Sequence, residues 1–258
     1  KAMTMIAEDP SKEISSDINP IHALKQQEVI TYGGTGGRDR QTMVKHTRIY
    51  HENDMGIISE ASPDNGDVGI TVYASAAPLL NDTHGTHTKY KHDKSDPKPA
   101  QLFSTAAMLA PFTDKDDMKR VNFVSVQRSH VLPCAGYHQP TVRTSYEYVM
   151  AHRMGKNYAH IASKPGKVKE INKNGMIVEY KDGKLEGFRI GRHYGQSAGL
   201  TIPQSVVTQL KEGDSFKAGD YLIYNEGFFE PDFFNPKRLC FKNTVNARVA
   251  FMDIKDTH

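Results

Sequence analysis

Tryptophan is absent from this chain of 258 residues, and cysteine occurs only twice, as Cys134 and Cys240. Two thiols so far apart in the sequence fit reduced structural cysteines of a cytosolic protein better than the disulfide framework of a secreted one. No run of about 18 apolar residues is present, so no segment qualifies as a membrane-spanning helix, and no charged-then-apolar leader marks a secretory signal. We therefore expect a cytoplasmic protein with no membrane partner.

The sequence also lacks a strong excess of charge of one sign. Lys and Arg number 33 against 30 Asp and Glu, which gives a formal net charge of +3. A protein that binds nucleic acid on its own usually carries a stronger basic excess. Either the basic groups are concentrated locally, or partner chains make most of any contact with nucleic acid. The length is sufficient for one large or two modest domains with a real core.

Local patterns indicate a β-rich chain with a few short helices. Asn19 and Pro20 are typical of an N-cap and a first helical position, and residues 101–110 predict a second helix that Pro111 ends. Candidate strands, which are rich in β-branched residues or separated by Gly-containing turns, are residues 68–74, 167–171, 176–180 and 185–190, segments within 206–224, and 247–252. The expected fold class is therefore α+β, mainly β with short helices.

A glycine cluster at residues 33–37 reads GGTGG and is followed by Arg38 and Arg40. It matches neither the spaced dinucleotide fingerprint nor the Lys-Ser/Thr end of a P-loop, so by itself it is typical of a flexible turn. A glycine hinge beside paired guanidiniums also suits a loop that moves close to phosphates. The residues alone leave both interpretations open.

The histidines give no metal-site pattern. His84, His87 and His92 lie in a polar loop, and Cys134 precedes His138 by four residues. Neither group has the paired close spacing of a structural zinc site, so we interpret them as solvated loop residues.

Residues 111–133 combine acids, bases and short apolar steps. Asp116 and Asp117 are adjacent, and neighbouring side chains of an extended segment point to opposite faces. We therefore expect a capping or salt-bridge role that orients Arg120, in preference to a shared metal ion. A guanidinium can bind two phosphate oxygens at once and offset charge on a leaving pyrophosphate. Arg120 is either such a phosphate ligand or a solvated helix-face arginine balanced by the two acids.

This segment resembles part of the second-largest (β) subunit of multisubunit DNA-directed RNA polymerases. The family has Pro-Phe, a basic residue, Asp-Asp, Arg, and a run ending Gln-Arg-x-x-x-Pro. Here these are Pro111-Phe112, Lys115, Asp116-Asp117, Arg120, Gln127-Arg128 and Pro133. Residues 38–40 are similar to the Arg-Glu-Arg of the family's fork loop, and residues 48–69 to its Arg-Asp-x-His and Thr-Pro-Glu-Gly-Pro-Asn steps, with Asp67 in place of Asn.

The resemblance implies a fork-loop region at residues 1–110, followed at 111–258 by hybrid-binding β-barrel and barrel-sandwich elements. It implies that the candidate catalytic residue Arg120 contacts the NTP triphosphate and that Arg38, Arg40, Gln127 and Arg128 contact nucleic acid. Mg²⁺ would be held mainly by a partner β′-like subunit, with no metal ligand in this chain. The other implied partners are further β-like fragments, an initiation factor, the DNA template, the RNA transcript and NTPs. Nucleotidyl transfer would belong to the complex, and the chain would be inactive alone.

The family's flanking lobes do not occur in this sequence, which predicts a split or truncated β-like subunit of the kind that large bacteriophages encode. That origin would place the protein in the host-cell cytoplasm or in the virion. A second hypothesis comes from a different class. Near-neutral charge and Gly-Asp turns between strands also fit a structural or carbohydrate-binding β-module, for example a virion protein. The first hypothesis predicts polymerase partners, and the second predicts a chain that folds stably alone.

Overall fold

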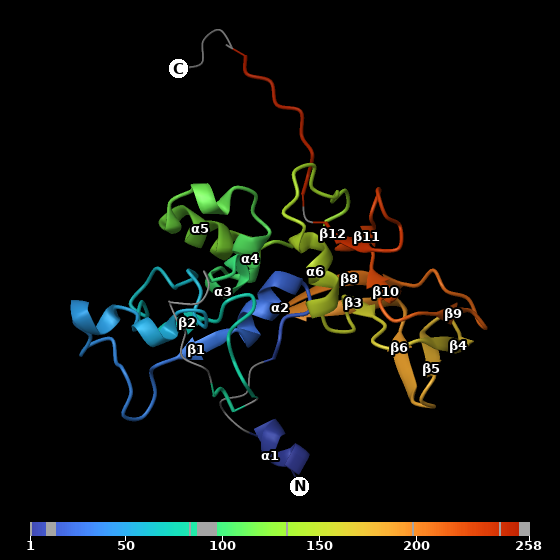
Figure 1. Ribbon diagram of the computed structural model, residues 1–258, viewed down its shortest axis with the longest axis horizontal. Helices are drawn as coiled ribbons and strands as arrows, with labels where there is room; N and C mark the ends of the chain where they lie inside the picture. The colour runs from blue at the N-terminus through green and yellow to red at the C-terminus, as the bar shows by residue number, and fades with distance from the viewer. Residues whose placement is uncertain are drawn as a thin grey trace. The chain divides into compact units, whose positions relative to one another are not determined.

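The computed structural model describes residues 2–8, 14–82, 84–86, 97–132, 134–197, 199–242 and 244–252. The chain divides into two compact units (Figure 1). Unit 1 comprises Lys1–Pro133, Arg143–Tyr146 and Arg192–Gln204, and unit 2 comprises Cys134–Val142, Glu147–Gly191 and Ser205–His258. Small antiparallel sheets and short helices make up the described residues, which confirms the predicted α+β fold class. No helix in these ranges is long and apolar enough to cross a bilayer.

Unit 1 is built from short helices around a two-stranded ladder. Helix α2 (Pro20–Gln27) begins where the sequence predicts, because the Asn19 side chain accepts hydrogen bonds from the backbone N–H groups of Ile21 and His22. The predicted strand at 68–74 is shorter, β2 (Thr71–Tyr73), and pairs antiparallel with β1 (Val29–Thr31). The remaining elements of this unit are α1 (Ala2–Glu8), η1 (Lys45–Arg48), η2 (Glu52–Asp54), α3 (Pro99–Leu102), α4 (Thr105–Met108), η3 (Thr113–Lys115) and α5 (Met118–Ser129).

The helix predicted at residues 101–110 is two helices, α3 and α4, separated at Ser104. The Ser104 hydroxyl accepts a hydrogen bond from the Ala107 N–H and so acts as an N-cap that starts a new helix. Helix α5, which lies next to α4 (Figure 1), does not follow from hydrophobic periodicity. Its buried positions are Val121, Ser125 and Ser129, a stripe in which only one residue is apolar.

Unit 2 is the β-rich part of the chain. The predicted hairpin at 167–171 and 176–180 is confirmed as β4 (Gly166–Ile171) and β5 (Gly175–Tyr180), with Val168 opposite Val178. The predicted strand at 185–190 is β6 (Leu185–Arg189), and the sheet order is β6-β5-β4-β9. Its other strands are β3 (Ala159–Ile161), β9 (Ser215–Phe216), β10 (Tyr221–Asn225), β11 (Phe229–Pro231) and β12 (Leu239–Phe241). Residues of both units occur in α6 (Tyr146–Arg153), β7 (Gly191–Ser197) and β8 (Leu200–Val207).

The core of unit 2 joins side chains from these strands. Val168, Met176 and Val178 pack with Phe216 and Leu222, and all five are essentially inaccessible to solvent. Burial of each such side chain contributes about 1.5–3 kcal/mol, so this cluster contributes substantially to the stability of the unit. The predicted strand at 247–252 was wrong, because this segment is irregular and exposes its apolar side chains. No described strand lies beside it to satisfy its backbone groups.

Candidate functional site

Helix α5 carries Arg120, Gln127 and Arg128 of the motif, and the two acids of the motif lie immediately before it. Asp117 is its N-cap, and the Asp117 carboxylate accepts a hydrogen bond of 3.0 Å from the Lys119 N–H. The Asp116 carboxylate accepts one of 2.8 Å from the Asp117 N–H. Asp117 therefore performs the capping that the sequence predicts and fixes the start of the helix.

Arg120 lies in the first turn of α5 with an exposed side chain. Within the described ranges, its guanidinium has no hydrogen-bond or ion-pair partner. Gln127, which is also exposed, is seven residues further along the helix. Seven residues are nearly two complete turns, so both side chains leave the same face of α5 about 10 Å apart along the axis. The structure thus brings two predicted site residues onto one solvent-facing strip, while Arg128 is partly buried in the last turn.

The C-terminal end of α5 is anchored by residues that the motif did not reveal. The Asn19 side-chain amide donates hydrogen bonds to the backbone carbonyls of Arg128, at 3.0 Å, and Val131, at 2.8 Å. The Nδ1 atom of His22 lies 3.1 Å from the Ser129 carbonyl oxygen. These contacts add side-chain partners to carbonyls at and just beyond the C-terminal end of α5. Sequence reasoning identified Asn19 as an N-cap, but nothing local indicates its second role.

The glycine loop is a tight structure held against residues 66–69. Gly34 and Gly36 have φ angles of 96° and 76°, a region that favours glycine. A Cβ atom at Gly37 would lie 2.4 Å from the Tyr32 carbonyl oxygen. The Arg38 guanidinium stacks 4.5 Å from the centre of the Tyr32 ring and donates a hydrogen bond of 2.6 Å to the Gly69 carbonyl. The loop shape therefore depends on both its glycines and Arg38.

Arg40 has an internal partner as well. Its Nε atom donates a hydrogen bond to Oδ1 of Asp67 and its Nη2 atom donates one to Oδ2, both at 2.6 Å. This bidentate contact lowers the pKa of the Asp67 carboxyl and raises that of Arg40. Arg48 donates from Nη1 to the carbonyls of Gly66 and Val68. The acid that replaces the family's Asn is therefore neutralised by this chain, and contact of Arg38 and Arg40 with nucleic acid stays a prediction.

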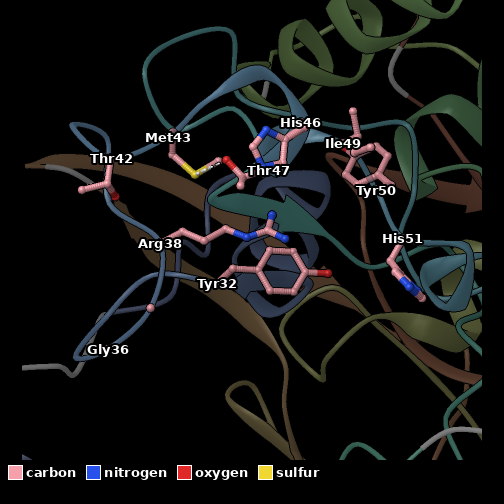
Figure 2. Close-up of a pocket in the computed structure, with 11 residues that line it drawn as sticks. Tyr32, Gly36, Arg38, Thr42, Met43, His46, Thr47, Ile49, Tyr50 and His51 are labelled. Carbon is pink, nitrogen blue, oxygen red and sulfur yellow. Dashed lines mark hydrogen bonds between the residues drawn. The ribbon is translucent and has the colours of Figure 1, made fainter.

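A hollow of about 650 Å³ lies beside this loop. Figure 2 shows the Arg38 guanidinium next to the Tyr32 ring, with His46 and Tyr50 above them in the view. Burial raises the pKa of the Tyr32 and Tyr50 phenols, and the Asp54 carboxylate adds to the effect at Tyr32. Both phenols are therefore neutral near pH 7. Aromatic rings interleaved with cationic groups can stack on planar ligands such as nucleobases, a feature that sequence reasoning missed because its residues are spread over 32–51.

Metal-ligating groups do not converge in the described ranges, where no three His, Cys, Asp or Glu side chains could hold one ion. Of the loop histidines, His84 lies in an exposed turn, and its backbone N–H donates to the Asp82 carboxylate. His87 and His92 lie outside the described residues. Cys134 is an exposed free thiol and Cys240 a buried one.

Comparison with known proteins places these residues in context. No family model matches the chain. Over 132 residues, 51% of this chain and 10% of the relative, it is 29% identical to the DNA-directed RNA polymerase subunit beta of Acetivibrio thermocellus. It is 28% identical to that of Limosilactobacillus reuteri over 171 residues and 27% identical to that of Streptococcus sanguinis over 175 residues, each 66% of this chain and 14% of the relative. The chain thus spans a small part of the length of these relatives. The matches support, at the level of the family, the β-subunit likeness that the motifs predict.

Proposed function

We propose that this chain is a β-like segment of a multisubunit DNA-directed RNA polymerase and that it supports nucleotidyl transfer as part of that complex. The observation that carries the proposal is α5, on which the family-like motif becomes a capped helix with Arg120 exposed on the same face as Gln127. The similarity to β subunits of three bacteria supports the same assignment. In this proposal the strip from Arg120 to Gln127 faces the NTP-binding end of the polymerase active-site cleft.

Arg120 would bind the triphosphate of the incoming NTP. Because its guanidinium has no partner among the described residues, it is available to clamp two phosphate oxygens. Such a contact offsets charge that develops on the leaving pyrophosphate and so acts in the transition state. Gln127 and Arg128 would line the RNA–DNA hybrid, and Arg38 and Arg40 would lie near phosphates at the edge of the bubble.

Mg²⁺ would be held mainly by acids of a β′-like partner. The acids closest to Arg120 in the chain, Asp116 and Asp117, direct carboxylate oxygens at backbone N–H groups of α5 and its approach. They do not fit a metal site, and we derive no step through the ion from this chain. The remaining proposed partners are further β-like fragments, an initiation factor, the DNA template and the RNA transcript. We further propose that this β-like segment comes from a bacteriophage and acts in the cytoplasm of the host cell.

Arg120→Ala tests the proposal in the assembled polymerase. We expect the apparent KM for NTPs to rise and kcat to fall, with a combined loss of about 100-fold in kcat/KM, because a charge-assisted contact present in the transition state is removed. Lys119→Ala, which removes an exposed neighbouring cation, is the control and should change kcat/KM little. Unchanged kinetics for the Arg120 variant would refute the role. Purification from the native source followed by mass spectrometry should also recover a β′-like chain, and recovery of a solitary protein would contradict the proposal.

A further inference from the structure

Glu60 connects two helices that are far from it in the sequence. Its Oε2 atom accepts a hydrogen bond of 2.7 Å from the Ser104 N–H. Its Oε1 atom lies 2.7 Å from the Ser104 hydroxyl and 2.8 Å from the Ser125 hydroxyl, and the two hydroxyls are 2.9 Å apart. Ser104 caps α4 and Ser125 lies in the middle of α5, so one carboxylate joins both helices.

The surroundings make these contacts strong. Ser104 and Ser125 are 5% and 2% exposed, and Glu60 is itself partly buried. Hydrogen bonds to an ionised carboxylate are about twice as strong as those between neutral groups, and a buried hydroxyl that loses its partner is costly. The Glu60 carboxylate therefore holds α4 and α5 in one arrangement.

The segment that carries Glu60 contacts α5 a second time, through Ser62. The Ser62 N–H donates a hydrogen bond of 3.0 Å to the Asn122 side-chain oxygen. Contacts at residues 122 and 125 of α5 restrict its rotation about its own axis as well as its distance from that segment. Since Asn19 and His22 bind the far end of the helix, α5 is held both at its middle and at its C-terminal end.

Rotation of α5 determines where Arg120 points. Each residue turns the helix by about 100°, so Ser125 lies about 140° around the axis from Arg120. With Ser125 fixed inward on Glu60, Arg120 faces outward, as observed. If loss of this contact allowed α5 to rotate, the guanidinium would move away from the triphosphate that it is proposed to bind. A displacement of about 1 Å is enough to reduce the rate of an enzyme reaction strongly.

We infer that Glu60 is a positioning residue for Arg120, acting through Ser125 and the orientation of α5. The inference rests on the proposed function, because it assigns Glu60 a role in binding NTP through an arginine that it does not touch. It differs from a purely structural role in one measurable respect. If Glu60 acts through Arg120, its effect on NTP use must disappear when Arg120 is absent.

The experiment compares variants of the assembled polymerase on a preformed template–transcript scaffold, with the apparent KM for NTP and kcat measured separately. Glu60→Ala should raise the KM about tenfold and lower kcat less. Glu60→Gln, which keeps an acceptor for the two hydroxyls but loses the one for the Ser104 N–H, should recover part of the loss. Asp64→Asn changes an exposed acid of the same loop and should behave like the wild type.

A double-mutant cycle then separates the two claims. When Arg120→Ala is already present, Glu60→Ala should cause less than about a twofold further change in KM, because coupled residues are non-additive. An undiminished effect in that background would overturn the positioning role, and so would a normal KM for Glu60→Ala alone. A normal KM for Arg120→Ala would instead remove the proposed function. If Glu60→Ala prevents assembly, Ser125→Ala, which keeps the contact of Glu60 with α4, enters the same cycle and must show the same non-additivity.

Discussion

Asn19→Ala should loosen α5 more than any change of a single residue on the helix surface. The side chain of Asn19 is 3% exposed and serves two elements. Its oxygen caps α2, and its amide donates to the carbonyls of Arg128 and Val131. Loss of an N-cap costs about 1 kcal/mol, and each lost hydrogen bond costs about the same when a buried partner remains. The sum is about 3 kcal/mol.

Amide hydrogen exchange of Met118–Ser129 measures this effect directly, in whichever complex contains the chain. The two hydrogen bonds to the end of α5 account for about 2 kcal/mol of this sum, which should accelerate exchange in α5 about thirtyfold. Asn19→Asp keeps the acceptor that caps α2 but loses both donors, so it should release α5 while α2 stays protected. Asn157→Ala, at an exposed asparagine, is the control and should leave exchange unchanged. Exchange in α5 that stays within about threefold of the wild type in Asn19→Ala would refute the reasoning.

Two further predictions concern the glycine loop. Gly37→Ala should lower the unfolding temperature, at a cost of about 2 kcal/mol, because the added Cβ would lie 2.4 Å from the Tyr32 carbonyl oxygen. Gly187→Ala is the control and should be neutral, because no atom lies within 4 Å of its added carbon. An unchanged unfolding temperature for Gly37→Ala would contradict the prediction, because it would show that the loop moves freely to accommodate the added carbon. Asp67 should titrate by carboxyl NMR below the ordinary aspartate range and return toward it in Arg40→Ala. Since the folded pKa is lowered, the Arg40–Asp67 pair stabilises the loop above the ordinary pKa and is lost as the pH falls through the folded value. An Asp67 titration that Arg40→Ala leaves unmoved would contradict this.

Local signals in the sequence predicted the elements that local contacts determine. Asn19 and Pro20 define the start of α2, and Gly175 with the alternation around it defines the β4–β5 hairpin. Helix α5 could not be predicted in this way, because Ser125 and Ser129 on its buried face look like surface residues. Their burial depends on partners elsewhere in the chain, and a polar residue is acceptable in a core only where such a partner exists.

The candidate site likewise combines residues that the local sequence reveals with a residue that it does not. The motif identified Arg120 and Gln127, and helix geometry placed them on one face. Nothing local identifies Glu60, which is separated from Ser104 by 44 positions and from Ser125 by 65. A contact of that separation is a property of the tertiary fold, and a single sequence gives no indication of it.

The pairing of Arg40 with Asp67 has a consequence for how the glycine loop would meet a polyanion. To occupy the Nε/Nη2 edge of Arg40, a phosphate must displace a carboxylate that already accepts from two of its five N–H groups. An arginine that is free in solution recruits a phosphate and releases condensed counterions from the nucleic acid, which makes affinity fall steeply with ionic strength. At Arg40 the exchange of one anion for another leaves a carboxylate behind, so added salt would weaken both the starting and the final contact. The affinity of a phosphate for this edge of Arg40 would therefore depend only weakly on ionic strength.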